Sequence, residues 1–271
     1  MVPAKGEARG RAKIISELKL ADFYVFVDFA REAFGVPDEN QCRGSLFTNQ
    51  ELAIAYILDF EKAIFLQQEG VVLEGLLRYM ASNATRFSSP KEVMPVVQRL
   101  VQEKEWDPRY SRHLVVDHIR WSDRIIRFGS HTGQPLVGRF LYLDIENRRT
   151  DLAALNCVAR LASISRPPDP PYVSPDRSHL KVTGHPGFVQ TVWPASKGAF
   201  DLLIVEDGGG SILLNNALDV IPRTPILSAP GEYRLYYEVL AEGFPILRLT
   251  VQLQASGDAS TTQASLVTCD I

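Results

Sequence analysis

The spacing of apolar residues changes near the middle of the chain. Over Ile14–Val101 apolar residues recur mostly at intervals of three and four, which is typical of amphipathic helices. After Trp106-Asp-Pro108 apolar and polar residues alternate instead, as in RFLYLDIE at Arg139–Glu146. The pattern therefore predicts an α+β protein in two parts, a helical bundle at 14–108 followed by an antiparallel β-sandwich at 110–254.

Start and stop signals divide the N-terminal part into four expected helices. The clearest start is Thr48-Asn-Gln-Glu51, a capping box in which the hydroxyl and the carboxylate each satisfy a free backbone amide. Ser89-Pro-Lys-Glu92 resembles a second capping box, with proline at the first helical position. Gly35 and Pro37 stop the first helix. The expected helices are 14–34, 48–69, a third that contains Leu73–Met80 and a fourth that contains Val93–Val101.

Short segments rich in branched and aromatic residues predict six or seven strands in the C-terminal part. These segments are His118–Phe128, Arg139–Glu146, Asn156–Ile164, Ala199–Val205, Tyr233–Leu240 and Ile246–Leu253. In Tyr233–Leu240, the set Tyr233, Leu235, Tyr237 and Val239 is expected to face the core, because its complement contains charged residues. Residues 1–13 are expected to form a disordered arm, and the Ser/Thr-rich residues 255–271 a flexible tail.

Two pairs of segments in the β half resemble a known domain type. The first pair is Tyr142-Leu-Asp-Ile-Glu-Asn147 and Ala154-Leu-Asn-Cys157-Val-Ala-Arg-Leu161; the second is 231–239 and 244–251. They are similar to the opening and closing strand pairs of bacterial immunoglobulin-like domains of the CARDB type. The resemblance covers 110–254 and implies an immunoglobulin-like fold, but no particular activity. It departs from antibody-type domains, because Leu235 stands where their second cysteine would be. The N-terminal part carries no such resemblance.

Charge argues against a nucleic-acid partner. The net charge is −3, and 14 Lys and Arg stand against 16 Asp and Glu before Ser111, with 15 against 16 from there on. Neither part has the basic excess that nucleic-acid binding needs.

The expected compartment is the cytoplasm. Cys42, Cys157 and Cys269 are too few and too scattered for a disulfide framework, which fits a reducing environment. Residues 1–13 lead into no uninterrupted apolar stretch, so no secretory signal is expected. The most apolar region, Leu20–Phe34, contains four charged residues, so a transmembrane segment is not expected either.

Residue types that carry catalysis or bind metals do not occur in the patterns such sites need. No two histidines form a helical pair, and a zinc site from Asp176, His179 and His185 is only a minor alternative to exposed loop residues. Cys157 falls in an apolar strand and is interpreted as core. Gly208-Gly-Gly210 fits a hairpin turn rather than a phosphate loop. We therefore expect no catalytic residue, no metal and no cofactor.

Glu61 stands out in the N-terminal part. On the expected second helix it shares an arc with apolar residues, where a carboxylate is costly to bury without a partner. It could mark a buried polar site that handles protons or binds a ligand. The favoured alternative is a buried ion pair or hydrogen bond with Arg78 or Arg99 that ties two helices together.

The β half contains features that suit binding. Arg166-Pro-Pro-Asp-Pro-Pro-Tyr172 would be extended and stiff, and would lose little entropy on docking, although a rigid connection between strands explains it more simply. This half has 13 Arg and only two Lys, and Arg is favoured at interfaces; compositional bias explains the excess about as well. The candidate binding residues are Arg166, Tyr172, Arg177 and Trp193.

These observations favour a non-catalytic interaction or scaffolding protein whose β-sandwich recognises a protein partner. Two alternatives stay open. One is a regulatory sensor that binds a ligand in the helical half. The other is an enzyme whose site is assembled from residues distant in sequence.

Overall fold

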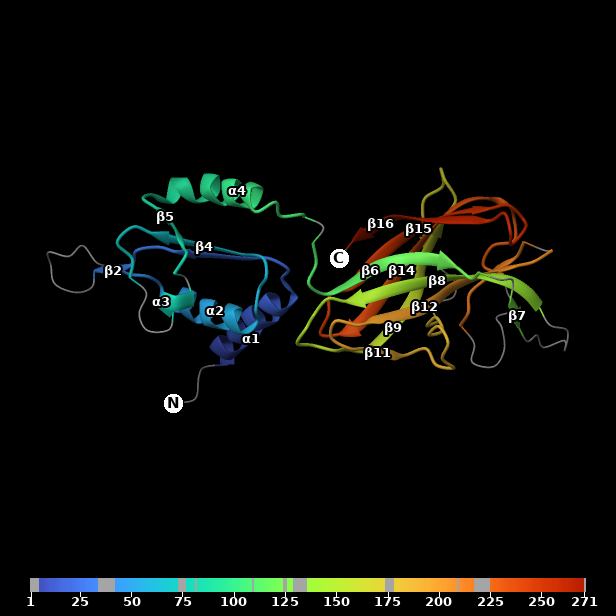
Figure 1. Cartoon of the computed structure of the whole chain (residues 1–271), viewed down its shortest axis with the longest axis horizontal. Coiled ribbons are helices and arrows are strands. Elements are labelled where there is room, and N and C mark those ends of the chain that lie inside the picture. The colour runs from blue at the N-terminus through green and yellow to red at the C-terminus, as the bar shows by residue number, and fades with distance from the viewer. Residues whose placement is uncertain are drawn as a thin grey trace. The chain divides into compact units, whose positions relative to one another are not determined.

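The chain folds into two compact units, Met1–Tyr110 and Ser111–Ile271. Figure 1 shows the computed structural model, in which strands prevail over helices. The structure describes residues 5–33, 42–72, 77–80, 82–108, 110–123, 126–128, 136–173, 178–208, 210–216 and 225–270. Among these residues, no helix has both the length and the apolar composition that crossing a bilayer requires.

The N-terminal unit is not the helical bundle that the apolar spacing predicted. Its centre is a parallel three-stranded sheet with the order β1-β4-β5. Strand β1 (Tyr24–Asp28) lies inside the expected helix 14–34, and β4 (Ala63–Gln68) lies inside the expected helix 48–69. The prediction was wrong because both faces of these strands carry apolar residues, and such runs cannot be told from a helix by spacing alone.

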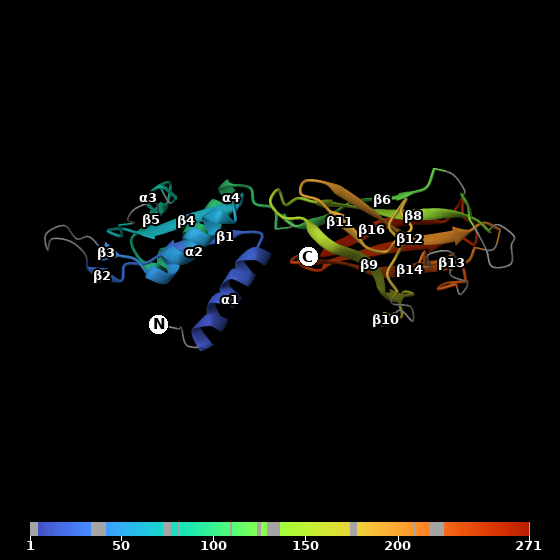
Figure 2. The ribbon, with the colours of Figure 1, turned by 90° about the horizontal axis from the view of Figure 1, so that it is seen from below.

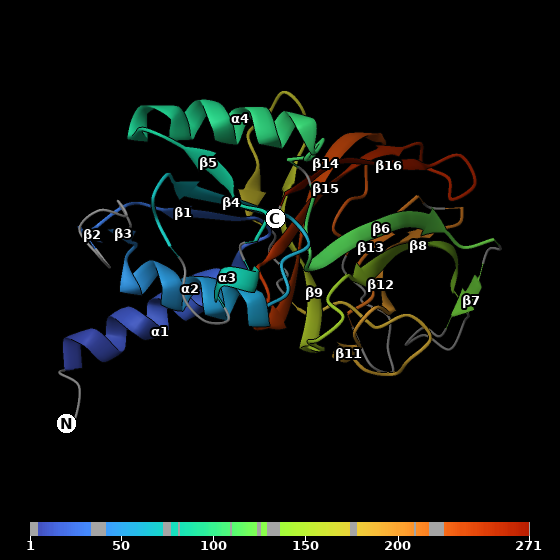
Figure 3. The same cartoon turned by 60° about the vertical axis from the view of Figure 1, so that its left-hand side comes forward.

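Helices surround this sheet. They are α1 (Lys5–Leu20), α2 (Leu46–Ile57), α3 (Leu77–Met80) and α4 (Val93–Glu103). The third strand of the sheet is β5 (Thr85–Phe87). The remaining elements are the strand pair β2 (Glu32–Ala33) and β3 (Cys42–Arg43) and the 3₁₀ turn η2 (Pro90–Glu92). Figure 3 shows α4 on one side of β1, β4 and β5 and α2 on the other. Residues 5–13, which were expected to be disordered, belong to α1.

The two capping signals have different outcomes. Helix α2 begins at Leu46 with Ser45 as its N-cap, three residues before the predicted Thr48. At the second signal, the Glu92 carboxylate accepts hydrogen bonds from the backbone N–H of Ser88, at 3.0 Å, and from its hydroxyl, at 2.5 Å. In a capping box the glutamate carboxylate accepts from the backbone N–H of the N-cap residue. Here the Glu92 carboxylate accepts instead from the backbone N–H of Ser88, the residue before the N-cap Ser89.

Each face of the parallel sheet has its own core. Tyr24 and Phe26 pack on the α2 residues Leu52 and Ala55. On the opposite face, Ile64, Leu66 and Phe87 pack against the apolar stripe of α4, which contains Val93, Val96, Val97, Leu100 and Val101. The amphipathic pattern of α4 was therefore a correct prediction, and the apolar residues of the strands serve to hold helices on both sides.

The C-terminal unit consists of two antiparallel sheets. One has the order β10-β9-β14-β15-β16 with β11 also on β9, and the other has the order β13-β12-β8-β6 with β7 on β8. Figure 2 shows the two layers. Their strands are β6 (Leu114–Trp121), β7 (Ile126–Phe128), β8 (Leu136–Asn147), β9 (Ala154–Ser165), β10 (Tyr172–Val173), β11 (Gln190–Val192), β12 (Lys197–Glu206), β13 (Ile212–Leu213), β14 (Gly231–Glu242), β15 (Leu247–Ala255) and β16 (Gln263–Asp270). Strand β16 lies in the segment that was expected to be a tail.

The two sheets share one apolar core. Its fully buried side chains come from both layers, and they include Leu141, Phe200, Leu161 and Leu235. In β14 the predicted register is confirmed, because Tyr233, Leu235, Tyr237 and Val239 are buried while Arg234 is exposed. Alternation on this strand is readable because only one of its faces packs in the core.

This register predicts unequal effects for two neighbouring substitutions. Leu235→Ala removes a fully buried side chain and should lower the free energy of unfolding by about 2–5 kcal/mol, whereas Arg234→Ala should lower it by well under ~1 kcal/mol. Urea unfolding of the two variants and of the unmodified chain measures both. Equal losses would contradict the register.

Candidate functional site

The connection from Arg166 to residue 186 is less free than its sequence indicates. Tyr172 and Val173 pair with β9 as strand β10. The guanidinium of Arg166 lies 5.7 Å from the centre of the Tyr233 ring, and its Nη2 donates to the carbonyl oxygen of Pro230 at 3.4 Å. Arg166 is therefore engaged within the unit. Arg177 lies outside the described residues.

Trp193 and Tyr172, which the sequence grouped as one binding surface, lie at opposite ends of β9. Tyr172 pairs with Ile164, whereas Val192 pairs with Ala154. At the rise of a β-strand this separates the two aromatic residues by about 30 Å. The structure does not bring them together.

Two more exposed apolar residues belong to the segments that pair or bond with the backbone before Trp193. Val192 and Ala154 both point into the core, so the residues next to them, Trp193 and Leu155, point outward on the same face. Leu152 lies beside Gly243 in the adjacent turn. These three side chains, which we term the tryptophan patch, are 65% (Trp193), 45% (Leu155) and 37% (Leu152) exposed.

The backbone beneath the tryptophan patch is held by one buried side chain. The Nδ2 of Asn147 donates to the carbonyl oxygens of Leu152, at 2.9 Å, and Val192, at 3.0 Å. Its Oδ1 accepts from the backbone N–H of Arg149 at 3.1 Å. Three hydrogen bonds from one amide therefore lock the two segments that present the patch, at positions fixed by the sheet.

An ion pair closes the same end of the unit. Arg149 is buried, and its Nε and Nη2 each donate to the Asp151 carboxylate at 2.6 Å. These bonds hold the pKa of Asp151 below its usual range. The backbone N–H of Ala195 donates to the Arg149 carbonyl oxygen at 2.9 Å, which secures the turn after Trp193. Hydrogen bonds of Asn147 and Arg149 thus hold the turns that carry the tryptophan patch.

A second polar cluster lies on the other sheet. His118 Nδ1 is 2.9 Å from Asp117, its Nε2 is 3.0 Å from Asp144, and Arg120 Nε donates to Asp144 at 2.6 Å. Lys197 Nζ lies 2.7 Å from Asp117 and lowers the pKa of that carboxyl. The charges of this cluster are matched internally across β6, β8 and β12, so it serves strand pairing.

Glu61 is not a buried helical residue. Helix α2 ends at Ile57, and Glu61 lies in the turn before β4 with its side chain exposed. It accepts a hydrogen bond from the Tyr110 hydroxyl at 2.9 Å and lies 3.4 Å from the Lys62 ammonium. The predicted buried polar site, and the ion pair with Arg78 or Arg99 considered as its alternative, both presupposed a helix that is absent here.

Among the described residues, the N-terminal unit buries a different carboxylate, that of Asp28 at the carboxyl end of β1. Ligands of open α/β sheets bind at such strand ends. Asp28 is fully enclosed, and a Cβ on Gly44 would overlap its carboxylate. Burial raises the pKa of Asp28, and attraction to the Gln67 amide and the Ser45 backbone N–H offsets part of this increase. Neither carboxylate oxygen has a partner among the described residues at hydrogen-bond distance and angle. Asp28 is therefore a buried carboxylate between the end of β1 and the start of α2, and burial is the largest influence on its pKa.

Among the described residues, neither Cys157 nor a metal-binding cluster provides a reactive site. Burial raises the pKa of the Cys157 thiol to about 12, so the thiol stays neutral in the core. In the part of the chain that the structure describes, no three His, Cys, Asp or Glu side chains lie close enough together to hold a metal ion. Comparisons with protein-family profiles and with curated proteins find no match.

The environment of Asp28 predicts a pH dependence of stability. Between the ordinary carboxyl pKa of 3.8 and the raised value, the folded chain binds more protons at this group than the unfolded chain does. The free energy of unfolding should therefore contain a component that falls as the pH rises through this window. Asp28→Asn should remove that component, so its stability should fall less between pH 4 and pH 7 than that of the unmodified chain. Urea unfolding at several pH values measures the difference, and parallel profiles would contradict the prediction.

Proposed function

We propose that the protein is a non-catalytic binding protein and that its C-terminal unit recognises a protein partner through the tryptophan patch. The observation that supports this most directly is the exposure of Trp193 on a backbone locked by Asn147. Tryptophan is enriched among the residues that contribute most to protein interfaces. A rigid frame lets it bind with little loss of conformational entropy.

The energetics of Trp193 support binding rather than stability. About two thirds of its surface lies in water, so covering it would remove on the order of 150 Å² of mostly apolar area, worth roughly 3–4 kcal/mol before the cost of association. Leu152 and Leu155 extend this apolar surface. An apolar cluster of this kind, rimmed by polar groups, is typical of an interaction site.

Acidic residues at the rim of the patch support a partner with basic groups. Glu242 lies opposite Leu155 in the pairing of β14 with β9, and its carboxylate accepts from Asn156 Nδ2 at 2.6 Å. Asp151 is also half-exposed beside its partner Arg149. A partner surface with an apolar pocket flanked by Lys or Arg would complement this arrangement.

Trp193→Ala and Tyr172→Ala form a matched test of this proposal. Both residues are exposed aromatics on β9-paired segments, but Tyr172 lies at the other end of the strand. Once a partner has been captured by the full chain and identified, Trp193→Ala should weaken its binding by at least ~30-fold, while Tyr172→Ala should leave the Kd within about twofold. Both variants should retain the Tm of the unmodified chain, because neither side chain is buried.

The opposite ranking would return recognition to the proline-rich connection that contains Tyr172. Unchanged binding in Trp193→Ala would show that the tryptophan patch is not the recognition surface.

A further inference from the structure

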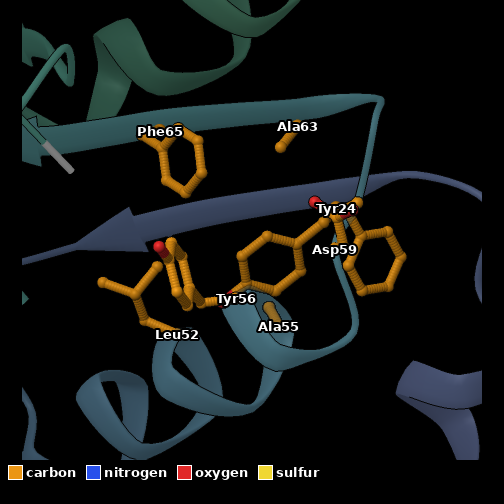
Figure 4. Close-up of a pocket in the computed structure, with 8 residues that line it drawn as sticks. Tyr24, Leu52, Ala55, Tyr56, Asp59, Ala63 and Phe65 are labelled. Carbon is orange, nitrogen blue, oxygen red and sulfur yellow. The ribbon is translucent and has the colours of Figure 1, made fainter. Parts of the chain in front are cut away.

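The N-terminal unit contains a hollow between α2 and the first residues of β1 and β4. Of its lining residues, Tyr24 and Leu52 are buried, whereas Tyr56 and Asp59 are exposed; Figure 4 draws all four. Its other lining residues are Ala55, Phe60, Ala63 and Phe65. The hollow is independent of the tryptophan patch, which belongs to the other unit.

Aromatic rings form much of the wall. The ring centres of Tyr24 and Phe60 lie 5.4 Å apart with the rings nearly stacked, and the Tyr24 and Phe65 rings meet edge to face at 6.3 Å. Mutual packing fixes the orientation of these rings. Because the face of an aromatic ring carries negative partial charge, a wall of rings attracts a cation once water has been displaced.

Three groups at or near the hollow contribute negative charge. Helix α2 ends at Ile57, beside the hollow, and the free carbonyl groups of a helix C-terminus carry negative partial charge. Asp59, two residues further on, is an exposed carboxylate held at a φ of 49°. Burial raises the pKa of Tyr24, and repulsion from the Glu51 carboxylate raises it further, which places a second carboxylate within electrostatic reach.

Lys62 is the lysine nearest to the lining residues along the chain. The ammonium of Lys62 lies 5.3 Å from the centre of the Tyr110 ring and 3.4 Å from Glu61. It is thus committed to residues outside the lining of the hollow. A ligand would have to bring its own positive charge.

We propose that this hollow binds a small organic cation, an alkylammonium group, which packs on the aromatic wall and lies near Asp59 and the C-terminus of α2. An anion would be repelled by the same groups, and a neutral apolar ligand would gain burial without the electrostatic attraction. The alkylammonium group can belong to a free metabolite or to a modified lysine of another protein, and the chemistry of recognition is the same.

Choline and its neutral isostere 3,3-dimethylbutan-1-ol provide the direct test. They have the same shape and differ in charge, so titration of each into the full chain, followed by NMR or calorimetry, isolates the electrostatic contribution. Choline should bind, and the isostere should bind at least ~5-fold more weakly, as expected for a partly desolvated cation on aromatic rings. Equal affinities, or no choline binding at millimolar concentration, would overturn the proposal.

Variants of the exposed lining residues locate the site. Tyr56→Ala should weaken choline binding by about 3- to 30-fold, and Tyr56→Phe should preserve it, because the ring face is the attractive element. Asp59→Asn should weaken it as well, since asparagine tolerates the positive φ but lacks the charge. Tyr79→Ala, which removes an even more exposed tyrosine on α3 outside the hollow, is the control and should have no effect. Equal losses in Tyr56→Ala and Tyr79→Ala would place binding elsewhere.

A peptide that carries trimethyllysine separates the two sources of the cation. Binding tighter than that of choline assigns the hollow to a protein side chain, whereas binding equal to or weaker than that of choline assigns it to a free small molecule. Both results uphold cation recognition. None of these cation-binding experiments involves the tryptophan patch. Their failure would therefore leave the proposed function untouched, and failure of the Trp193 test would leave the cation site untouched.

Discussion

The register of β9 is the constraint on which most of the C-terminal unit depends. This strand pairs with β14 along one edge and with β10 and β11 along the other. Its buried residues Ala159 and Leu161 face the shared core, so a slip by one residue would turn them to solvent. The same register sets which residues flank Trp193 and separates it from Tyr172. The strand pairing of β9 that buries the core therefore also determines which residues surround Trp193 on the surface.

The two units differ in how readable their strands are in the sequence. Strand β14 buries one face, and its alternation revealed both its existence and its orientation. In the parallel sheet, Phe26 and Phe65 pack toward α2 while Ile64 and Leu66 pack toward α4. Apolar residues therefore occupy both faces of these strands, and the sequence shows no alternation of apolar and polar positions. The positions of apolar residues were therefore informative only where solvent covers one side of a strand.

The candidate site was predictable in part. Trp193 could be proposed from its type and its place beyond the proline-rich connection, but Leu152 and Leu155 could not, because strand pairing brings them to it. Asn147 ends an apolar strand in the sequence, yet its three hydrogen bonds depend on turns that no spacing rule predicts. Glu61 was misassigned because the signal that ends α2 is a left-handed Asp59 rather than a glycine or a proline.

The C-terminal unit has an excess of arginine, which could have indicated a charged interface. Most of those that the structure describes instead bind other residues of the same unit. Most described arginines pair with a carboxylate or stack on an aromatic ring of their own unit: Arg120 with Asp144, Arg139 on Trp121, Arg149 with Asp151, Arg160 with Glu238, Arg166 on Tyr233 and Arg248 with Glu238. Guanidinium groups engaged in this way have little free charge with which to steer a partner. Affinity at the tryptophan patch would then come mainly from apolar burial. Only the attraction of Glu242 and Asp151 for basic residues of the partner should weaken with salt, because screening acts on charges and not on buried area.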